Sequence, residues 1–117
     1  MKDKNKILAR EVLLAFWKVH ILHHAGEGPL VGQWMLSELR EHGYDVSPGT
    51  LYPLLRRMEQ YGWLRSKADG RRGARARREY FLTTEGRKVL NQLRDHIAEM
   101  HGEVVRDAQR SRLQSRK

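Results

Sequence analysis

The chain has 117 residues, of which 23 are lysine or arginine and 14 are aspartate or glutamate, so its formal net charge is +9. This length suits one domain with a modest core and is too short for two independent domains, and this charge favours anionic partners. The absence of cysteine excludes disulfides and thiolate metal sites. The N-terminal apolar stretch is broken by Arg10, Glu11 and Lys18 and has no small-residue cleavage site, so we expect a cytoplasmic protein with no membrane partner.

Residues 7–24 are predicted to form the first helix. Two apolar stripes run along it, one through Leu8, Val12, Ala15, Phe16 and Val19 and the other through Leu13, Trp17 and Ile21. A helix that is apolar on two sides needs two partners. We therefore expect this helix to pack in its own domain and also to contact a second copy of the chain. The breaker cluster AGEGP, residues 25–29, should end it.

A second helix is expected over residues 30–42, and Gly43 supplies the residue at which it stops. Its inward side chains are predicted to be Val31, Trp34, Met35 and Leu39.

A third helix is expected within the stretch SPGTLYPLLRRMEQYGWL, residues 47–64, where Ser47 is suited to the N-cap. One apolar helical face is predicted from the spacing of Leu51, Leu54, Leu55 and Met58. Pro53 interrupts this pattern. If the helix begins near Gly49 or Thr50, the amide that Pro53 lacks would have had little or no partner, so the proline would help to define the helix start.

A basic hairpin is predicted next, with strands at residues 63–67 and 77–83 around a loop at residues 68–76. Between Arg65 and Arg78 there are six arginines and one lysine against a single acid, Asp69. Such a loop cannot build a core, and its composition suits a position beside polyphosphate.

The last helix is expected over residues 84–106, with Thr83 as its N-cap. Its apolar residues recur at intervals of 3, 4, 3 and 4, the spacing of a helix that lies along another helix: Leu90, Leu93, Ile97, Met100 and Val104. We predict that they form a dimer seam. Residues 107–117 are expected to be a basic, flexible tail.

This order of helix, turn, helix and basic hairpin is that of a winged helix-turn-helix. We therefore predict a mainly α fold with a small β-hairpin, in which residues 1–83 bind DNA and a long C-terminal helix dimerises. Arginine can bind guanine or phosphate, hydroxyl groups suit phosphate oxygens, and a helix N-terminus attracts anions. The predicted DNA contacts are Ser47, Gly49, Thr50, Tyr52, Pro53, Arg56 and Arg57 on the third helix and Arg71, Arg72, Arg75 and Arg77 in the wing.

Two stretches of the sequence resemble a known family. VSPGTLYPLLRRMEQYGWL, followed by the basic hairpin and by YFLTTEGRKVL, is similar to the PadR family of bacterial transcriptional regulators over about residues 30–93. The resemblance implies a homodimeric winged helix-turn-helix repressor whose last helix makes the dimer. It also implies that Tyr80 closes the wing and that the positions from Gly49 to Tyr52, with Pro53 and Arg56, form the recognition surface.

Histidines are the other unusual feature. His20 and His24 stand at i and i+4 and can share a helix face, as metal-binding pairs do, and imidazole suits Zn, Ni and Cu. No carboxylate or thiolate has matching spacing, so an ordinary interfacial or surface role is the stronger interpretation, and His20 and His24 remain only candidate metal ligands. His42 lies near a helix end, where it is interpreted as a favourable cation.

An effector site is predicted where the first helix meets the partner's last helix. Its candidate residues are Trp17, His20, His24, His96 and Met100. A planar aromatic molecule stacked on Trp17 and a transition metal on the histidines both fit, whereas Trp17 on its own is better interpreted as a core or dimer residue. No cofactor is required.

The sequence carries no nucleophile elbow, phosphate loop or metalloprotease motif, so we expect no enzyme. We predict a dimeric, sequence-specific DNA-binding transcriptional regulator that reads an inverted-repeat operator in double-stranded DNA, a repressor released by a small-molecule or metal signal. The alternative is a winged-helix module that binds RNA or a protein partner.

Overall fold

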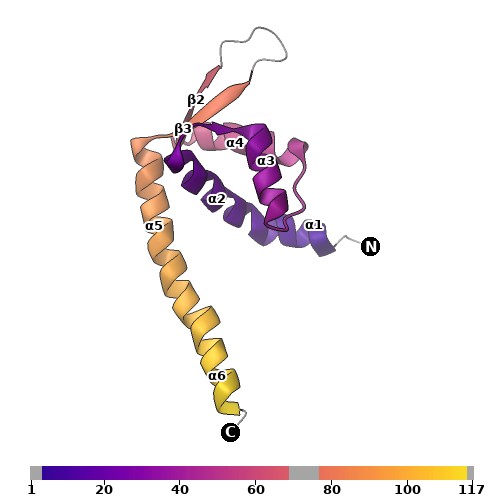
Figure 1. Ribbon diagram of the computed structural model, residues 1–117, viewed down its shortest axis with the longest axis vertical. Coiled ribbons are helices and arrows are strands. Elements are labelled where there is room, and N and C mark those ends of the chain that lie inside the picture. The colour runs from indigo at the N-terminus through magenta and orange to yellow at the C-terminus, as the bar shows by residue number, and fades with distance from the viewer. Residues whose placement is uncertain (1–3, 69–76, 116–117) are drawn as a thin grey trace.

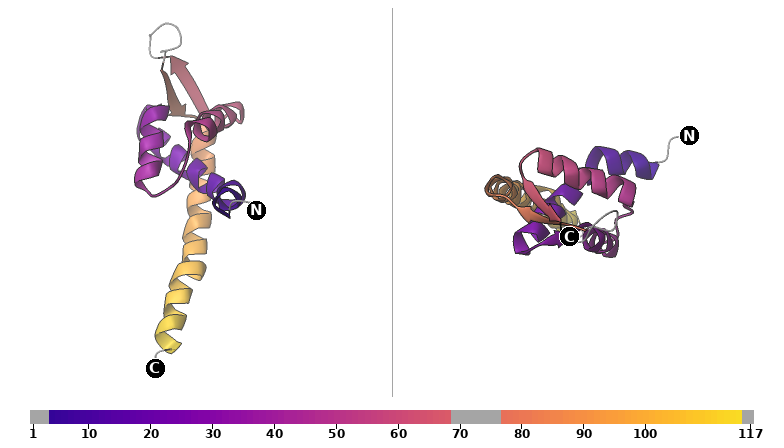
Figure 2. Two further views of the ribbon diagram at one scale, coloured as in Figure 1. Left: turned by 90° about the vertical axis from the view of Figure 1, so that its right-hand side faces the viewer. Right: turned by 90° about the horizontal axis from the view of Figure 1, so that it is seen from above.

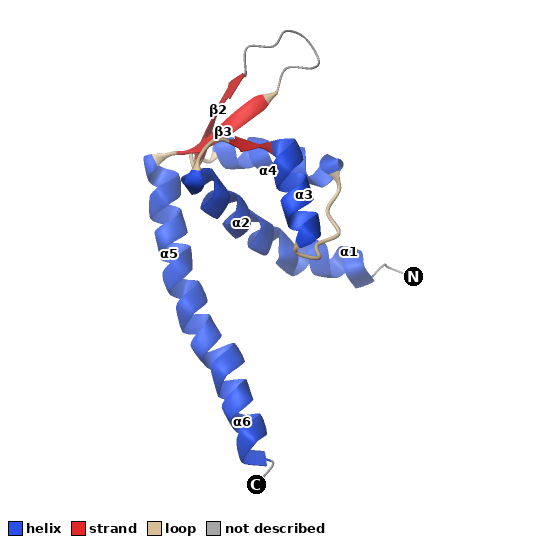
Figure 3. Ribbon diagram, in the orientation of Figure 1, coloured by secondary structure: helices blue, strands red, loops and turns tan. Residues whose placement is uncertain are grey.

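The computed structural model describes residues 4–68 and 77–115, drawn in Figure 1 with its elements labelled and in Figure 3 by element type. Helices dominate, and a small antiparallel sheet lies at one end, which confirms the predicted mainly α class. The segments η1 and η3 are helical with wider, π-type turns. The elements are α1 (Lys4–Leu8), η1 (Ala9–Leu13), α2 (Leu14–Glu27), β1 (Leu30–Val31), α3 (Gly32–Glu41), α4 (Pro48–Gln60), β2 (Leu64–Ala68), β3 (Arg78–Leu82), α5 (Thr84–His101), η3 (Gly102–Asp107) and α6 (Ala108–Ser115).

The first helix runs continuously through α1, η1 and α2, because the residues at both junctions keep helical backbone angles. Of its two apolar stripes, the one through Trp17 and Ile21 is buried in the core, and the one through Leu8, Val12 and Phe16 is exposed. The helix ends at Glu27 and not at residue 24 as expected, because Ala25 is still packed in the core.

The sheet has three strands, so the prediction of a two-stranded hairpin was incomplete. β3 lies in the middle, with β2 on one side and β1 on the other, where Leu30 faces Tyr80 and Val31 faces Glu79. Residues 30–31 were expected to open the second helix, which instead begins at Gly32. A two-residue strand has no periodicity of its own, and it forms because the free edge of β3 supplies its hydrogen-bond partners.

The second predicted helix, α3, ends before Gly43, whose φ of 92° confirms it as the stop. Met35 and Leu39 face inward as predicted. The prediction for Trp34 was wrong, because this side chain is 50% exposed and lies edge-on against the His24 ring.

The third predicted helix, α4, buries its four apolar residues completely, as the spacing predicted: Leu51, Leu54, Leu55 and Met58. Ser47 is the N-cap residue, although its hydroxyl donates to the hydroxyl of Thr50 and caps no amide. The expectation for Pro53 was wrong. Because α4 begins at Pro48, the missing amide of Pro53 would have bonded to the carbonyl of Gly49, so one helical hydrogen bond is lost. Gly49 is exposed, so water can reach its carbonyl.

The last helix begins at the predicted N-cap, where the Thr83 hydroxyl accepts a hydrogen bond from the Gly86 amide at 2.9 Å. It does not end near residue 106 but continues through η3 and α6, so the tail predicted at residues 107–117 is helical as far as Ser115. Alanine, glutamine, arginine and leucine in this segment are good helix formers, which explains the continuation.

Only the upper part of the last helix packs against its own domain. Leu90 is buried in the core of its own chain, and Leu93 is half-buried against that core. The prediction that Leu90 forms part of a dimer seam was therefore wrong. Ile97, Met100 and Val104 are 40%, 47% and 62% exposed. Figures 1 and 2 show the lower part of α5 and α6 extending away from the domain, in the direction opposite to β2 and β3, and the molecule measures 65 × 40 × 22 Å. Among the described residues, no helix combines the length and the apolar character that crossing a bilayer requires.

Candidate nucleic-acid interface

The outward face of α4 carries the predicted recognition residues. Because the inner face is fully buried, the side chains of Tyr52, Pro53, Arg56 and Arg57 are directed to the surface, where all four are exposed. Thr50 is half-buried beside Ser47 at the start of the helix. The structure thus places these predicted contacts on one continuous surface, beginning at a helix N-terminus that favours negative charge.

The ring of Tyr52 lies against the beginning of α3. A Cβ atom added at Gly32 would lie only 2.5 Å from Cε1 of Tyr52, so this approach requires glycine at residue 32. The tyrosine is thereby held between its own helix and α3. Gly32 was absent from the predicted site because nothing in the sequence relates it to a residue twenty positions later.

A groove of about 350 Å³ joins α4 to the sheet. Its lining comes from α4, β2 and β3: Arg56, Glu59, Gln60, Ser66, Arg78 and Tyr80. Within it, the Glu59 carboxylate accepts hydrogen bonds from the amide of Ser66 at 2.9 Å and from its hydroxyl at 2.7 Å. These two bonds fix the wing relative to the recognition helix. Glu59 and Ser66 were not among the site residues predicted from the sequence. A single acidic residue on an otherwise basic helix face was the one feature that could have pointed to Glu59.

The positive charge of the groove comes from Arg56 of α4 and Arg78 of β3. Arg78 donates to the hydroxyl of Ser66 at 3.2 Å. On the opposite face of the hairpin, the Arg65 guanidinium stacks 4.6 Å from the centre of the Phe81 ring. Burial raises the pKa of Tyr80, and the Glu59 carboxylate adds to this effect, so its hydroxyl stays protonated and can donate a hydrogen bond. Arg56 and Arg78 therefore lie in the same groove as a neutral phenol.

Four arginines were predicted to contact DNA from the wing. Arg77, the residue before β3, is exposed. The other three, Arg71, Arg72 and Arg75, lie outside the described residues.

The histidines form a second concentration of polar groups, on the side of α2 that faces the end of α3. His20 and His24 share a face as predicted, with nearly parallel rings whose centres are 6.5 Å apart. His42 joins them, and its ring centre is 5.0 Å from that of His20. Burial lowers the pKa of His20, and the neighbouring imidazoles of His42 and His24 lower it further, so the neutral ring is favoured. The interpretation of His42 as a helix-end cation missed this contact.

The predicted effector site is not assembled within the single chain. Trp17 is only 2% exposed and packs edge-on against Tyr44, so no ring face is open for a planar ligand to stack on. The stripe that carries Trp17 faces the core, so Trp17 is the core residue that it was interpreted as, and stacking of an aromatic ligand on it is ruled out. An effector site that the partner's last helix completes stays a prediction. His96 and Met100 are exposed on α5, and in the described part of the chain His96 makes no ring contact with His20 or His24.

Comparison with known proteins shows what the chain is similar to. The family described as the Transcriptional regulator PadR-like family matches residues 21–92. Transcriptional regulator Rv3488 of Mycobacterium tuberculosis is 46% identical over 99 residues, which are 82% of this chain and 89% of that protein.

Solved structures show the same likeness. A PadR family transcriptional regulator from Eggerthella lenta has a TM-score of 0.70 at 29% identity, with 85% of this chain and 87% of that one covered. A PadR-like transcriptional regulator from Bacillus cereus has a TM-score of 0.72 at 23% identity, with 87% and 96% covered, and shows likeness of fold alone.

Proposed function

This chain belongs to the transcriptional regulator PadR-like family, and we propose that it represses transcription as a homodimer bound to an inverted-repeat site in double-stranded DNA. Family membership confirms the resemblance predicted from the sequence and makes the chain a transcriptional regulator and not an enzyme. Dimerisation, sequence specificity and repression are the proposed steps.

The proposal rests mainly on the direct attachment of the wing strand β2 to the recognition helix α4. The two hydrogen bonds from Ser66 to Glu59 hold β2 against α4, so Arg56 of α4 and Arg78 of β3, which line the same groove, approach a duplex as one surface. In a winged helix-turn-helix the second helix enters the major groove. Arg56 on the exposed face of α4 is then suited to a base edge, and the hydroxyls of Thr50 and Tyr52 to phosphate oxygens.

Two exposed apolar stripes support the dimer. One lies on the first helix at Leu8, Val12 and Phe16, and the other lies on the part of the last helix that leaves the domain, at Ile97, Met100 and Val104. A two-fold axis that pairs the first helix of one subunit with the last helix of its partner covers both stripes at once. Such a dimer reads half-sites about one helical turn apart, roughly 34–36 Å.

The test of the DNA surface compares Arg56→Ala with Arg110→Ala, which removes an equal charge from α6. The specific duplex is identified first, by sequencing the genomic DNA fragments that bind to the purified, unmodified protein. Titration of that duplex and of a scrambled one at several salt concentrations should show that Arg56→Ala loses discrimination by about 1–3 kcal/mol, whereas Arg110→Ala keeps it. Equal affinity of the unmodified protein for both duplexes, or tighter binding to RNA, would favour the alternative of an RNA- or protein-binding module.

The dimer is tested by light scattering after size exclusion. The unmodified protein should elute with the mass of two chains, and Ile97→Asp should elute as a folded monomer with weaker operator binding. A monomer at micromolar concentration in both cases refutes the dimer.

A further inference from the structure

Three imidazoles converge between α2 and the residue that follows α3. One ring nitrogen from each of His20, His24 and His42 lies within 4.8 Å of the others. His20 and His24 come from one face of α2, and His42 comes from a segment 18 positions further along the chain. The cluster therefore depends on the packing of two elements.

Acidic groups lie beside two of the three rings. The Oε1 atom of Glu38 lies 3.2 Å from Nε2 of His42 and 3.7 Å from Nε2 of His24, and Glu27 contacts the other ring nitrogen of His24. The three imidazoles supply nitrogen ligands, and the carboxylate of Glu38 adds a negative charge that attracts a cation bound between them.

The orientation of His24 fits a metal ligand. Its Nδ1 atom lies 2.8 Å from Oε1 of Glu27, and an N–H at that position donates to the carboxylate. The proton is thereby placed on Nδ1, which leaves Nε2 with a free lone pair on the side of Glu38 and His42. A carboxylate that fixes the tautomer of a ligating histidine in this way is a recurrent feature of zinc sites.

A second group of possible ligands overlaps the first but is less suitable. It consists of His23, His24 and Glu27, all from α2. Arg94 of α5 lies 3.2 Å from Nδ1 of His23, and its guanidinium can only donate, so this nitrogen is the acceptor and a permanent positive charge lies beside the ring. That charge opposes a cation at His23, and Glu27 is already engaged by His24.

From this geometry we infer that His20, His24 and His42 bind one divalent first-row transition ion, represented by Zn²⁺, with the Glu38 carboxylate beside two of the three ligands. Imidazole nitrogen selects Zn, Ni, Cu or Co over Mg and Ca. Zinc bonds of 2.0–2.1 Å in a tetrahedral site place ligand atoms about 3.3 Å apart, so the nitrogens must close by up to about 1.5 Å. His42 follows the end of a helix and is exposed, so its ring can make this adjustment.

The position of the site gives it a regulatory consequence, which rests on the proposed function. His42 immediately precedes the turn at residues 43–47 that leads into α4, whereas His20 and His24 belong to the helix whose other face is proposed to dimerise. A bound ion ties these two parts together and limits how the recognition helices of a dimer are placed. By linkage, the ion and the operator must then change each other's affinity.

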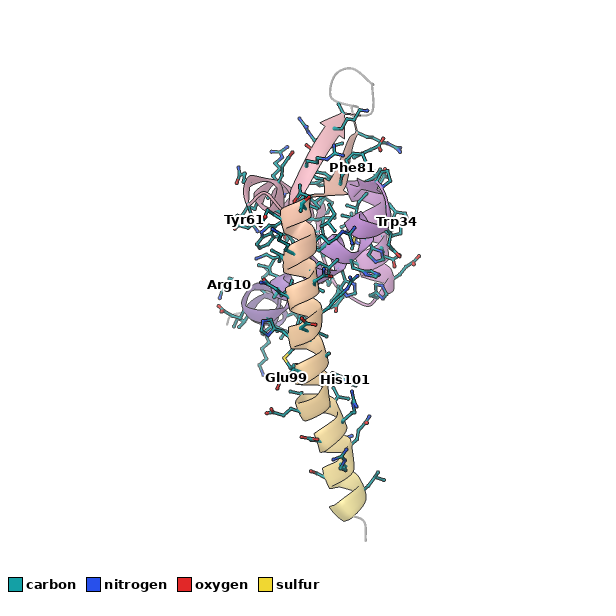
Figure 4. The ribbon with its side chains drawn as sticks, turned by 90° about the vertical axis from the view of Figure 1, so that its left-hand side faces the viewer. Arg10, Trp34, Tyr61, Phe81, Glu99 and His101 are labelled. Atoms are coloured by element: carbon teal, nitrogen blue, oxygen red, sulfur yellow. The ribbon has the colours of Figure 1, made fainter. Side chains whose placement is uncertain are left out.

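The site is tested by zinc titration of the untagged, full-length, metal-free protein against a chromogenic chelator, without DNA. We expect one ion per chain, and at least about a tenfold weaker affinity in His42→Ala, since loss of even an outer-shell partner costs that much. His101→Ala is the matched control, because His101 lies on the part of α5 that projects away from the domain (Figure 4). Circular dichroism with chelator present should show that both variants are folded.

Three results overturn the inference: no zinc binding, equal zinc affinity in His42→Ala and His101→Ala, or loss of binding in His23→Ala with retention in His42→Ala, which would assign the ion to the second group. The regulatory consequence is measured separately, as a change of about fivefold or more in operator affinity on adding zinc, absent from His42→Ala. Unchanged operator affinity with zinc bound overturns the coupling. Failure of the protein to bind DNA both with and without zinc, while zinc binding is intact, refutes the proposed function and leaves the metal site standing.

Discussion

Replacing Gly32 with alanine tests whether the position of the Tyr52 ring matters for DNA binding. The new methyl carbon would lie 2.5 Å from Cε1 and 3.2 Å from Cδ1 of Tyr52, and 3.4 Å from Cδ1 of Leu55. Carbon atoms in contact are about 3.5–4.0 Å apart, so the edge of the tyrosine ring must move by roughly 1 Å or more. The ring is partly exposed and can swing outward, whereas Leu55 is fully buried.

The cost to folding should be small because two effects oppose each other. Overpacking costs about 1–3 kcal/mol, whereas alanine in a helix is favoured over glycine by up to about 1 kcal/mol, so we expect a net loss of about 0–3 kcal/mol in the free energy of unfolding. The cost to binding should be larger. If the displaced Tyr52 hydroxyl loses a hydrogen bond to phosphate, affinity falls by about 1.5 kcal/mol, roughly tenfold, on specific and scrambled duplexes alike.

Urea denaturation and fluorescence-anisotropy titration measure the two effects. Gly102→Ala is the control, because a Cβ atom there meets nothing within 4 Å. The double variant Gly32→Ala, Tyr52→Ala should be at least as stable as Tyr52→Ala alone, since the overlap is gone. The reasoning is refuted if Gly32→Ala binds both duplexes as tightly as the unmodified protein, or if its loss of stability is unchanged when Tyr52 is alanine.

Three further substitutions probe how the wing and the last helix are attached. Glu59→Gln should lower the free energy of unfolding by about 1–3 kcal/mol through the hydrogen bonds from Ser66, and the exposed Glu99→Gln, measured in the same urea titration, should not. Gly86→Ala should lower the free energy of unfolding by about 1–3 kcal/mol or more relative to Gly102→Ala, because the added methyl group would overlap the backbone carbonyl of Trp63. Thermal melts measure this difference, and equal melting temperatures of the two variants would contradict it. Leu90→Asp should unfold the chain because Leu90 is buried in its own core, and circular dichroism would disprove this if the variant kept its helical signal.

Local patterns in the sequence determined the elements that frame the DNA surface. The four leucine and methionine positions of α4 repeat at the helical period over a long segment, and each is fully buried. Gly43 adopts the positive φ that its position at a helix end predicted, and Thr83 caps the last helix as predicted. These signals depend on the backbone preferences of a few neighbouring residues, so they can be interpreted without a partner.

The tertiary structure decided which of several equivalent surfaces is used. The sequence offered two apolar stripes on the first helix, and only packing against α3, α5 and β3 buries the one with Trp17 and leaves the other exposed. In the same way Trp34 is at the surface and Leu90 belongs to the core of its own chain. Hydrophobic burial depends on area and has no direction, so periodicity cannot say what covers an apolar face.

The contacts that join distant segments also came only from the tertiary structure. β1 exists because β3 has a free edge, Glu59 meets Ser66 because α4 and β2 pack together, and His42 reaches His20 only when α3 lies against α2. Hydrogen bonds and ring contacts act over a few ångströms, and the chain separation of these residues carries no information about such distances. The sequence therefore determined the helices and the chemistry they carry, whereas the fold determined which of those groups meet.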